Sequence, residues 1–184
     1  MKKYLVLALC LLILTVGHAQ NYTEYFANKT LRVDYIFTGD ASCQNVCLDE
    51  LSVLPSWAGR HQHLAELPLQ GNGQIIMKDL ESGKTVYTTS FSSLFQEWLE
   101  TDEAKVVSKG FENTFLLPYP LRPVEIEITL LSPRKEVRTC LKHTVRPDDV
   151  LIHQKGTAHI TPHKYLLKSG ETDKCIDVAI LAEG

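Results

Sequence analysis

Hydrophobic and polar residues alternate along several short stretches of the chain, which predicts β-strands with one buried face. The clearest is residues 124–131, where Val, Ile and Leu alternate with Glu and Thr until the final leucine pair. Residues 30–38 show the same period of two, with one apolar residue, Ile36, on the polar face. The predicted inward-facing residues of these two strands are Leu31, Val33, Tyr35, Phe37, Val124, Ile126, Ile128 and Leu130.

Turn residues between such stretches predict two hairpins. Residues 74–80 and 84–90 flank the short loop Glu81-Ser82-Gly83. A turn at residues 132–135 leads from the strand at 124–131 into a returning strand at 136–145. Residues 46–54 fit either a strand with a bulge or a short helical turn, which Pro55 ends.

One stretch has helical spacing. Residues 92–107 place Leu94, Phe95, Trp98 and Leu99 on one helical face, and Thr101 with the acidic residues after it resembles the start of a second short turn. Many short strands with a single helical insert are typical of a sandwich. We therefore predict a mainly β fold, an antiparallel, immunoglobulin-like β-sandwich with a short helical insert, over residues 20–150.

The pattern changes after Pro147. Residues 151–174 show little alternation and are predicted to hold the last strands and a linker. Residues 175–184 contain a nearly continuous apolar run from Ile176 to Leu181, interrupted by Asp177. Such a run is typical of a parallel strand that helices cover on both faces. We expect residues 175–184 to be the first strand of a truncated α/β domain.

The first 19 residues have the features of a secretory signal peptide. Lys2 and Lys3 precede a Leu-rich apolar run, and small residues before Gln20 predict cleavage after Ala19. The expected location is therefore secreted, periplasmic or on the cell surface. No later segment is long and apolar enough to predict a membrane span.

Cleavage leaves 165 residues, enough for one domain with a real core. It also leaves 17 basic and 22 acidic residues, a formal charge of about −5. Since no basic stripe is present, nucleic acid is not a predicted partner.

Four cysteines remain after cleavage: Cys43, Cys47, Cys140 and Cys175. An exported protein can hold disulfides, and four cysteines allow three pairings. Cys43 and Cys47 could close a small local loop as a disulfide. Free buried thiols agree equally well with the sequence.

The sequence contains no pattern that predicts a catalytic or metal site. His61 and His63 would lie on opposite faces of an extended segment. His159 and His163 have helical ligand spacing, but Pro162 between them would break that helix and no Glu general base accompanies them. No G-x-S-x-G elbow is present, and the Gly71-x-Gly73 pair reads as a hairpin turn. We assign no catalytic residue, no metal ligand and no cofactor to this chain.

Two tryptophans are the candidate binding residues. Trp57 and Trp98, with Tyr119 and Phe111, could form a platform for a glycan or a peptide. The alternative is that these rings belong to the core or cover the open end of the sandwich.

Several co-linear stretches resemble the amino-terminal domain of the IgA-peptidase-type zinc metallopeptidases of Bacteroides-like bacteria. The resemblance covers essentially the whole mature chain and lies in residues 30–39, 54–60, 90–98, 110–118, 143–149 and 176–184. It implies a β-sandwich that precedes an α/β catalytic domain. The H-E-x-x-H zinc site of that family lies downstream, so none of its residues can be assigned here.

The resemblance implies a non-catalytic accessory domain of a secreted zinc metallopeptidase, with zinc expected only in the missing catalytic domain. Its expected partners are its own catalytic domain and a protein substrate. A hypothesis from another class is a stand-alone secreted module that binds glycan or protein through Trp57 and Trp98.

Overall fold

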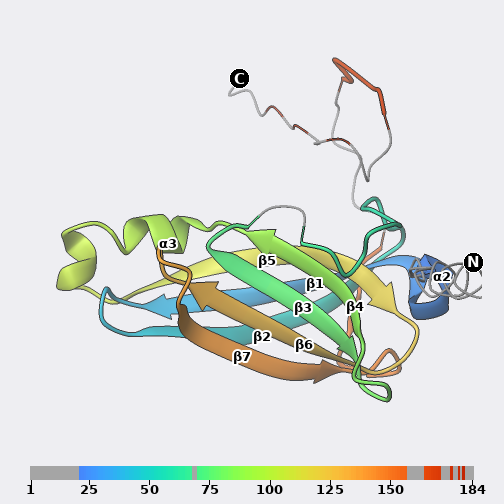
Figure 1. Ribbon diagram of the computed structural model, residues 1–184, viewed down its shortest axis with the longest axis horizontal. Helices are drawn as coiled ribbons and strands as arrows, with labels where there is room; N and C mark the ends of the chain where they lie inside the picture. Colours follow the sequence, from blue (N-terminus) through green and yellow to red (C-terminus); the bar gives the residue numbers. More distant parts are fainter. Residues whose placement is uncertain are drawn as a thin grey trace, which may run out of the picture.

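The computed structural model describes residues 21–67, 70–156 and 164–170, and the single residues 175, 178 and 180. Two four-stranded sheets pack face to face, as Figure 1 shows. The predicted mainly β sandwich is confirmed. No helix in the described part of the chain is long and apolar enough to cross a membrane.

The first sheet has the strand order β5-β1-β2-β8. Its bounds are β1 Phe26–Gly39, β2 Gln44–Leu54, β5 Lys109–Pro120 and β8 His153–Gln154. β1 is the central strand, because it pairs antiparallel with β2 on one side and with β5 on the other. β8 is only two residues long and pairs parallel with β2.

The second sheet has the order β4-β3-β6-β7 and is antiparallel throughout. Its bounds are β3 Gly73–Asp79, β4 Thr85–Phe91, β6 Val124–Leu131 and β7 Val137–Val145. Both predicted hairpins are present. In the first, Gly83 has a φ of 68°, a left-handed conformation that glycine adopts without strain.

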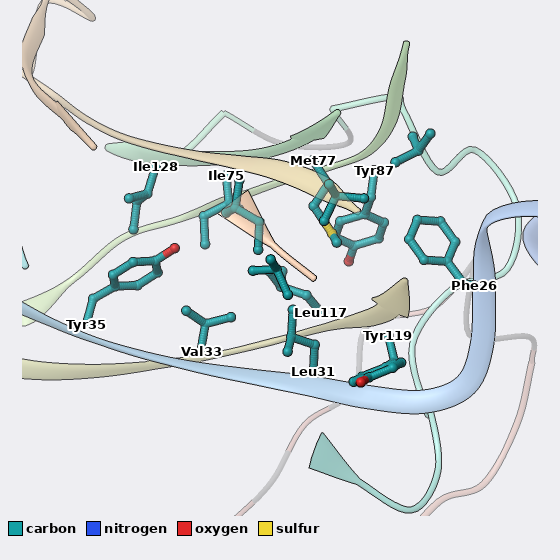
Figure 2. Close-up of a cluster of buried hydrophobic side chains, with 14 of the residues drawn as sticks. Phe26, Leu31, Val33, Tyr35, Ile75, Met77, Tyr87, Leu117, Tyr119 and Ile128 are labelled. Atoms are coloured by element: carbon teal, nitrogen blue, oxygen red, sulfur yellow. The ribbon is translucent and has the colours of Figure 1, made fainter. Parts of the chain in front are cut away.

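The core fills the space between the two sheets. Side chains of β1 and β5 point toward those of β3, β4 and β6, as the labelled residues in Figure 2 show. All eight residues predicted to face inward from residues 30–38 and 124–131 are buried. Alternation identified them because adjacent side chains of a strand point to opposite faces.

The stretch at residues 46–54 is a strand with a bulge rather than a helical turn. Asp34 of β1 pairs with Glu50 and Tyr35 pairs with Leu48, so Asp49 is the extra residue of β2. One inserted residue reverses the alternation. This shift explains why the apolar pattern in this stretch fitted two structures.

The helical insert is shorter than the sequence spacing predicted. Helix α3 covers Leu94–Trp98 and a 3₁₀ turn covers Glu103–Lys105, with an irregular segment between them. The Ser93 side chain caps α3, and Phe95 anchors it in the core. The side chain of buried Gln96 donates to the carbonyl oxygens of Asn72 and Leu131, which ties the helix to the second sheet.

A further helix, α2 (Tyr22–Tyr25), precedes β1 at the opposite end of the sandwich (Figure 1). The Tyr22 hydroxyl donates to the Ala27 carbonyl at 2.8 Å, and burial raises the pKa of Tyr22 to about 12. The predicted signal peptide lies outside the described residues, as does almost all of the predicted strand at 175–184. Both remain predictions, and so do the domain boundaries.

Two adjacent leucines of β5, Leu116 and Leu117, test which face of this strand is buried in the core. Leu117 is fully buried opposite Leu31, whereas Leu116 is half-exposed opposite Arg32. We expect Leu117→Ala to lower the free energy of unfolding by about 2–5 kcal/mol, because it leaves a cavity in the core. The matched Leu116→Ala should stay within about 0.5 kcal/mol of the unchanged protein. If chemical denaturation shows equal losses in free energy of unfolding for the two variants, the assignment of Leu117 to the buried face and Leu116 to the exposed face is wrong.

Candidate functional site

Trp57 lies just after β2 and is half-buried. Its indole nitrogen donates to the Arg60 carbonyl at 3.1 Å, and its ring meets the Tyr87 ring edge-on at 6.1 Å. A Cβ on Gly59 would stand 2.2 Å from the indole, so the loop folds back directly onto the ring. Trp57 therefore packs a loop against the edge of the second sheet.

Arg60 completes this loop. Its guanidinium donates to the carbonyl oxygens of Leu64, Glu66 and Thr88, and it lies 5.3 Å from the centre of the Tyr87 ring. The Thr88 amide donates to the Leu64 carbonyl at 2.8 Å. The loop thus covers the outer edge of β4, which would otherwise be open to another strand.

Trp98 is the last residue of α3 and is also half-buried. Its indole nitrogen donates to Glu103 Oε2 at 2.8 Å, and the Lys109 ammonium lies 5.6 Å from the centre of its ring. Glu103 also accepts from Lys109 at 2.6 Å, and both contacts lower the pKa of Glu103. Phe95 and Phe111 pack against the indole.

The structure does not bring the two tryptophans together. Trp57 follows the end of β2 that pairs with the start of β1, whereas Trp98 packs on Phe111, which pairs with Phe37 near the end of β1. The two rings therefore occupy opposite ends of the sandwich. Tyr119 and Phe111 are likewise separated, since they pair with Ala27 and Phe37. Ligand binding at Trp57 or Trp98 stays a prediction for two separate places.

The suggested Cys43–Cys47 disulfide is not formed in the structure. Both residues are exposed and free, and Gln44 to Cys47 lie in β2. Residues four apart on an extended chain are separated by about 13 Å, roughly twice the Cα–Cα distance of a disulfide. Cys140 and Cys175 are free and exposed as well, so these thiols are not the buried ones that the sequence also allowed.

The candidate histidines have other partners. The His61 ring packs on Tyr22 at 4.3 Å, and His63 Nδ1 lies 2.9 Å from Glu66 Oε1. His159 and His163 lie outside the described residues. Within the described ranges, no three His, Cys, Asp or Glu side chains come together as a group that could hold a metal ion.

A buried hydrogen bond joins the two sheets. The Tyr35 hydroxyl of β1 lies 2.6 Å from His143 Nε2 of β7, and the two rings meet edge-on at 5.7 Å. Burial lowers the pKa of His143 to about 4 and raises the pKa of Tyr35, so both groups are neutral at pH 7. Among the described residues, His143 Nδ1 is buried without a hydrogen-bond partner.

The last strand is held by a cluster of charges at the edge of the first sheet. Glu50 Oε1 of β2 contacts Lys155 Nζ at 2.9 Å and His153 Nδ1 at 3.1 Å. These hydrogen bonds, chiefly the one from Lys155, lower the pKa of Glu50. The Lys155 amide also donates to the Val53 carbonyl at 3.1 Å. The chain that follows the sandwich is therefore fixed to β2 by side chains and backbone together.

A second polar group lies on the outer face of the same sheet. Arg32 Nε contacts Asp34 Oδ1 at 3.0 Å, and the Thr114 hydroxyl donates to the same oxygen at 2.5 Å. Burial raises the pKa of Asp34, but the hydrogen bonds from Thr114 and Arg32 outweigh this effect and leave the pKa below its usual value. These contacts join β1 to β5 across the face that is turned away from the core.

Sequence patterns missed the charge cluster around Glu50. His153 and Gln154 show no alternation, and a two-residue strand gives too little pattern to detect. For the Tyr35–His143 pair, the alternation in residues 30–38 predicted only that Tyr35 faces inward. Their contact depends on how the two sheets stack, which no local pattern specifies.

The chain was compared with known proteins. No curated protein matches it. A protein-family model described as Peptidase M64 N-terminus matches residues 21–142, which span α2 and the strands from β1 to most of β7. The chain belongs to this family.

M64 is the IgA peptidase family, so the resemblance to the amino-terminal domain of IgA-peptidase-type metallopeptidases is confirmed. The family implies a zinc metallopeptidase. The described residues do not fit a zinc site, because a catalytic zinc needs three converging protein ligands and no such group lies among them. We therefore derive no chemical step through zinc for this M64 domain.

The Tyr35–His143 pair predicts a specific pH dependence of stability. As the pH falls from 6.5 to about 4, the unfolded chain binds a proton at His143 that the folded domain does not accept. The free energy of unfolding should therefore fall across this window, by ~3 kcal/mol at most. Carboxylates with lowered pKa values should add their own loss at lower pH.

Urea denaturation across this window checks the effect. Tyr35→Phe alone should destabilise the domain by about 1–3 kcal/mol at pH 7, because His143 Nε2 loses its partner. Tyr35→Phe with His143→Leu replaces both groups and should flatten the curve between pH 6.5 and 4. A double variant that keeps the full slope would contradict the role of His143.

Glu50→Gln tests the attachment of β8. The change removes the negative charge that Lys155 and His153 contact, so the Lys155 amide should exchange its hydrogen faster than in the unchanged protein. Glu112→Gln, an exposed acidic residue on β5, is the control and should leave this exchange unchanged. Equal exchange in both variants would show that the backbone bond to Val53 holds β8 without the charges.

Proposed function

We propose that this chain is the non-catalytic amino-terminal accessory domain of a secreted zinc metallopeptidase of the IgA-peptidase type. In this role it packs against the catalytic domain and supports it. The observation that carries the proposal is the match of residues 21–142, most of the described sandwich, to the M64 amino-terminal family. The zinc of such an enzyme would be held by the catalytic domain.

The chemistry of the described residues supports a role without catalysis. The polar side chains with shifted pKa values serve structural contacts: Tyr35 and His143 join the sheets, Glu50 holds β8, and Asp34 joins β1 to β5. Asp40 accepts from Ser42 and Ser108 in the turn after β1, and these hydrogen bonds lower its pKa. Each of these groups is occupied by a neighbour within the domain.

The shape of the domain also supports a packing role. Side chains fill the space between the two sheets, and both tryptophans use their indole N–H groups within the domain. A sandwich of this kind offers faces and end loops to a neighbouring domain. Interfaces between domains of one chain typically bury about 600–1,500 Å². We further propose a secreted, periplasmic or cell-surface location, and a protein substrate as the second partner of the whole enzyme.

Two measurements test this function. Purified residues 20–184 should not hydrolyse a protein substrate, with or without added zinc. In the full-length gene product, removal of residues 21–156 should lower the melting temperature of the catalytic domain, because the surface that it shares with the sandwich becomes exposed. Chelator-sensitive hydrolysis by residues 20–184, or an unchanged melting temperature after the removal, would contradict the proposal.

A further inference from the structure

Three connections of the sandwich meet at one end, which we name the linker end. They are residues 80–84 between β3 and β4, residues 121–123 between β5 and β6, and residues 146–152 between β7 and β8. Figure 1 shows them at the end that carries α2, away from α3. A backbone hydrogen bond joins the first two connections, and further bonds attach the second connection to α2 and the third to β5.

Each of these bonds fixes one connection. The Leu80 amide donates to the Pro123 carbonyl at 3.0 Å, and the Leu121 amide donates to the Tyr25 carbonyl at 2.8 Å. The Tyr119 hydroxyl donates to the Pro147 carbonyl at 2.8 Å. Each connection of the linker end is therefore fixed to the body of the domain by at least one hydrogen bond.

This surface presents aliphatic side chains to solvent: Leu80, Leu121, Val150 and Leu151. Val150 and Leu151 are held in this position by a short turn, in which Ile152 is buried and its amide donates to the Asp149 carbonyl at 3.1 Å. The Leu151 amide donates to the Asp149 side chain at 2.9 Å. Apolar side chains that are held outward in this way lose little entropy when a partner covers them.

Arg122 directly follows Leu121 in the sequence and lines a pocket together with Leu80. Its guanidinium stacks over the Tyr25 ring at 5.2 Å, and its contacts with Asp79 and Glu81 are long, at 3.9 and 4.0 Å. The side chain is half-exposed, so its donors remain accessible to a partner. An arginine on an aromatic ring with aliphatic neighbours is a combination enriched at protein interfaces.

The direction of β8 indicates what covers this surface. β2 ends at Leu54, which pairs with Thr30 near the start of β1, so β2 runs toward the linker end. β8 is parallel to β2, and the Lys155 amide continues the pairing as far as Val53. β8 therefore also runs toward the linker end. A domain that follows is held close to this surface at a high effective concentration.

We propose that the linker end is the docking surface for the peptidase domain of the same chain. Leu80, Leu121, Val150 and Leu151 form the apolar contact, and Arg122, beside Leu80, supplies hydrogen-bond donors. This inference rests on the proposed function, which assigns a catalytic domain to the same polypeptide. The inference further specifies which surface of the sandwich the catalytic domain covers.

Exposed residues away from the linker end supply matched controls. Val150 at the linker end is 92% exposed, and Val106 beside α3 is 83% exposed. The two valines therefore have similar exposure and can be compared directly. Leu121 is 50% exposed, and Leu116 is 53% exposed on the outer face of the first sheet. One variant carries Val150→Asp and Leu121→Asp, and the control carries Val106→Asp and Leu116→Asp.

Both double variants are made in the full-length gene product. The melting temperature of the catalytic domain is then measured in each variant, in the unchanged protein and in the version that lacks residues 21–156. Circular dichroism of residues 20–184 with the same changes verifies that the sandwich still folds. The linker-end variant should reproduce most of the loss caused by removing residues 21–156, because a buried carboxylate disrupts an apolar contact. The control should melt like the unchanged protein.

The outcomes separate this inference from the function on which it rests. If removal of the sandwich lowers the melting temperature and the linker-end variant does not, the docking surface is elsewhere and the proposed function stands. If both double variants lower it equally, the inference also fails. If removal has no effect, the proposed function itself fails. A dimer of residues 20–184 that the linker-end variant converts to monomers would instead assign this surface to a second copy.

Discussion

The packing of β1 against the second sheet is the constraint on which the rest of this domain depends. β1 pairs with both β2 and β5, and its inward side chains are fully buried. Leu31, Val33, Tyr35 and Phe37 reach across the interior toward β3 and β6, as Figure 2 shows for the labelled residues. Burial of apolar area of this kind is the dominant favourable contribution to folding. Every other strand of the first sheet is positioned through β1 or through β2.

The polar contacts of the domain are arranged around this core and depend on it. Tyr35 extends the inward row of β1 to His143 on the opposite sheet, so this hydrogen bond links the two layers across the interior. Asp34, on the other face of the same strand, accepts from Arg32 and Thr114. The charges at Glu50 then hold β8 on the edge of β2. Contacts made inside the domain thus set the position of β8 and Lys155.

Local sequence predicted several of the strands, because one buried face imposes a period of two, but it did not predict β5. That pattern identified the inward residues of β1 and β6 and both hairpins of the second sheet. The pattern was ambiguous at residues 46–54, where Asp49 forms a bulge. The helical spacing also predicted a longer helix than α3, which ends at Trp98. β8 was not predicted, because a strand of two residues is too short to show an alternating pattern. The separation of Trp57 from Trp98 followed only from the register of β1, a long-range property.

The function that we propose is one of placement. The M64 match identifies the domain, and the surface around Arg122 is the place at which we propose that a following domain packs. Hydrogen exchange, compared between residues 20–184 alone and the full-length gene product, is the most direct measurement. We expect slower exchange in the full-length protein within residues 146–152 and 121–123. Protection confined to residues 92–108 beside α3, or no protection at all, would contradict docking at the linker end.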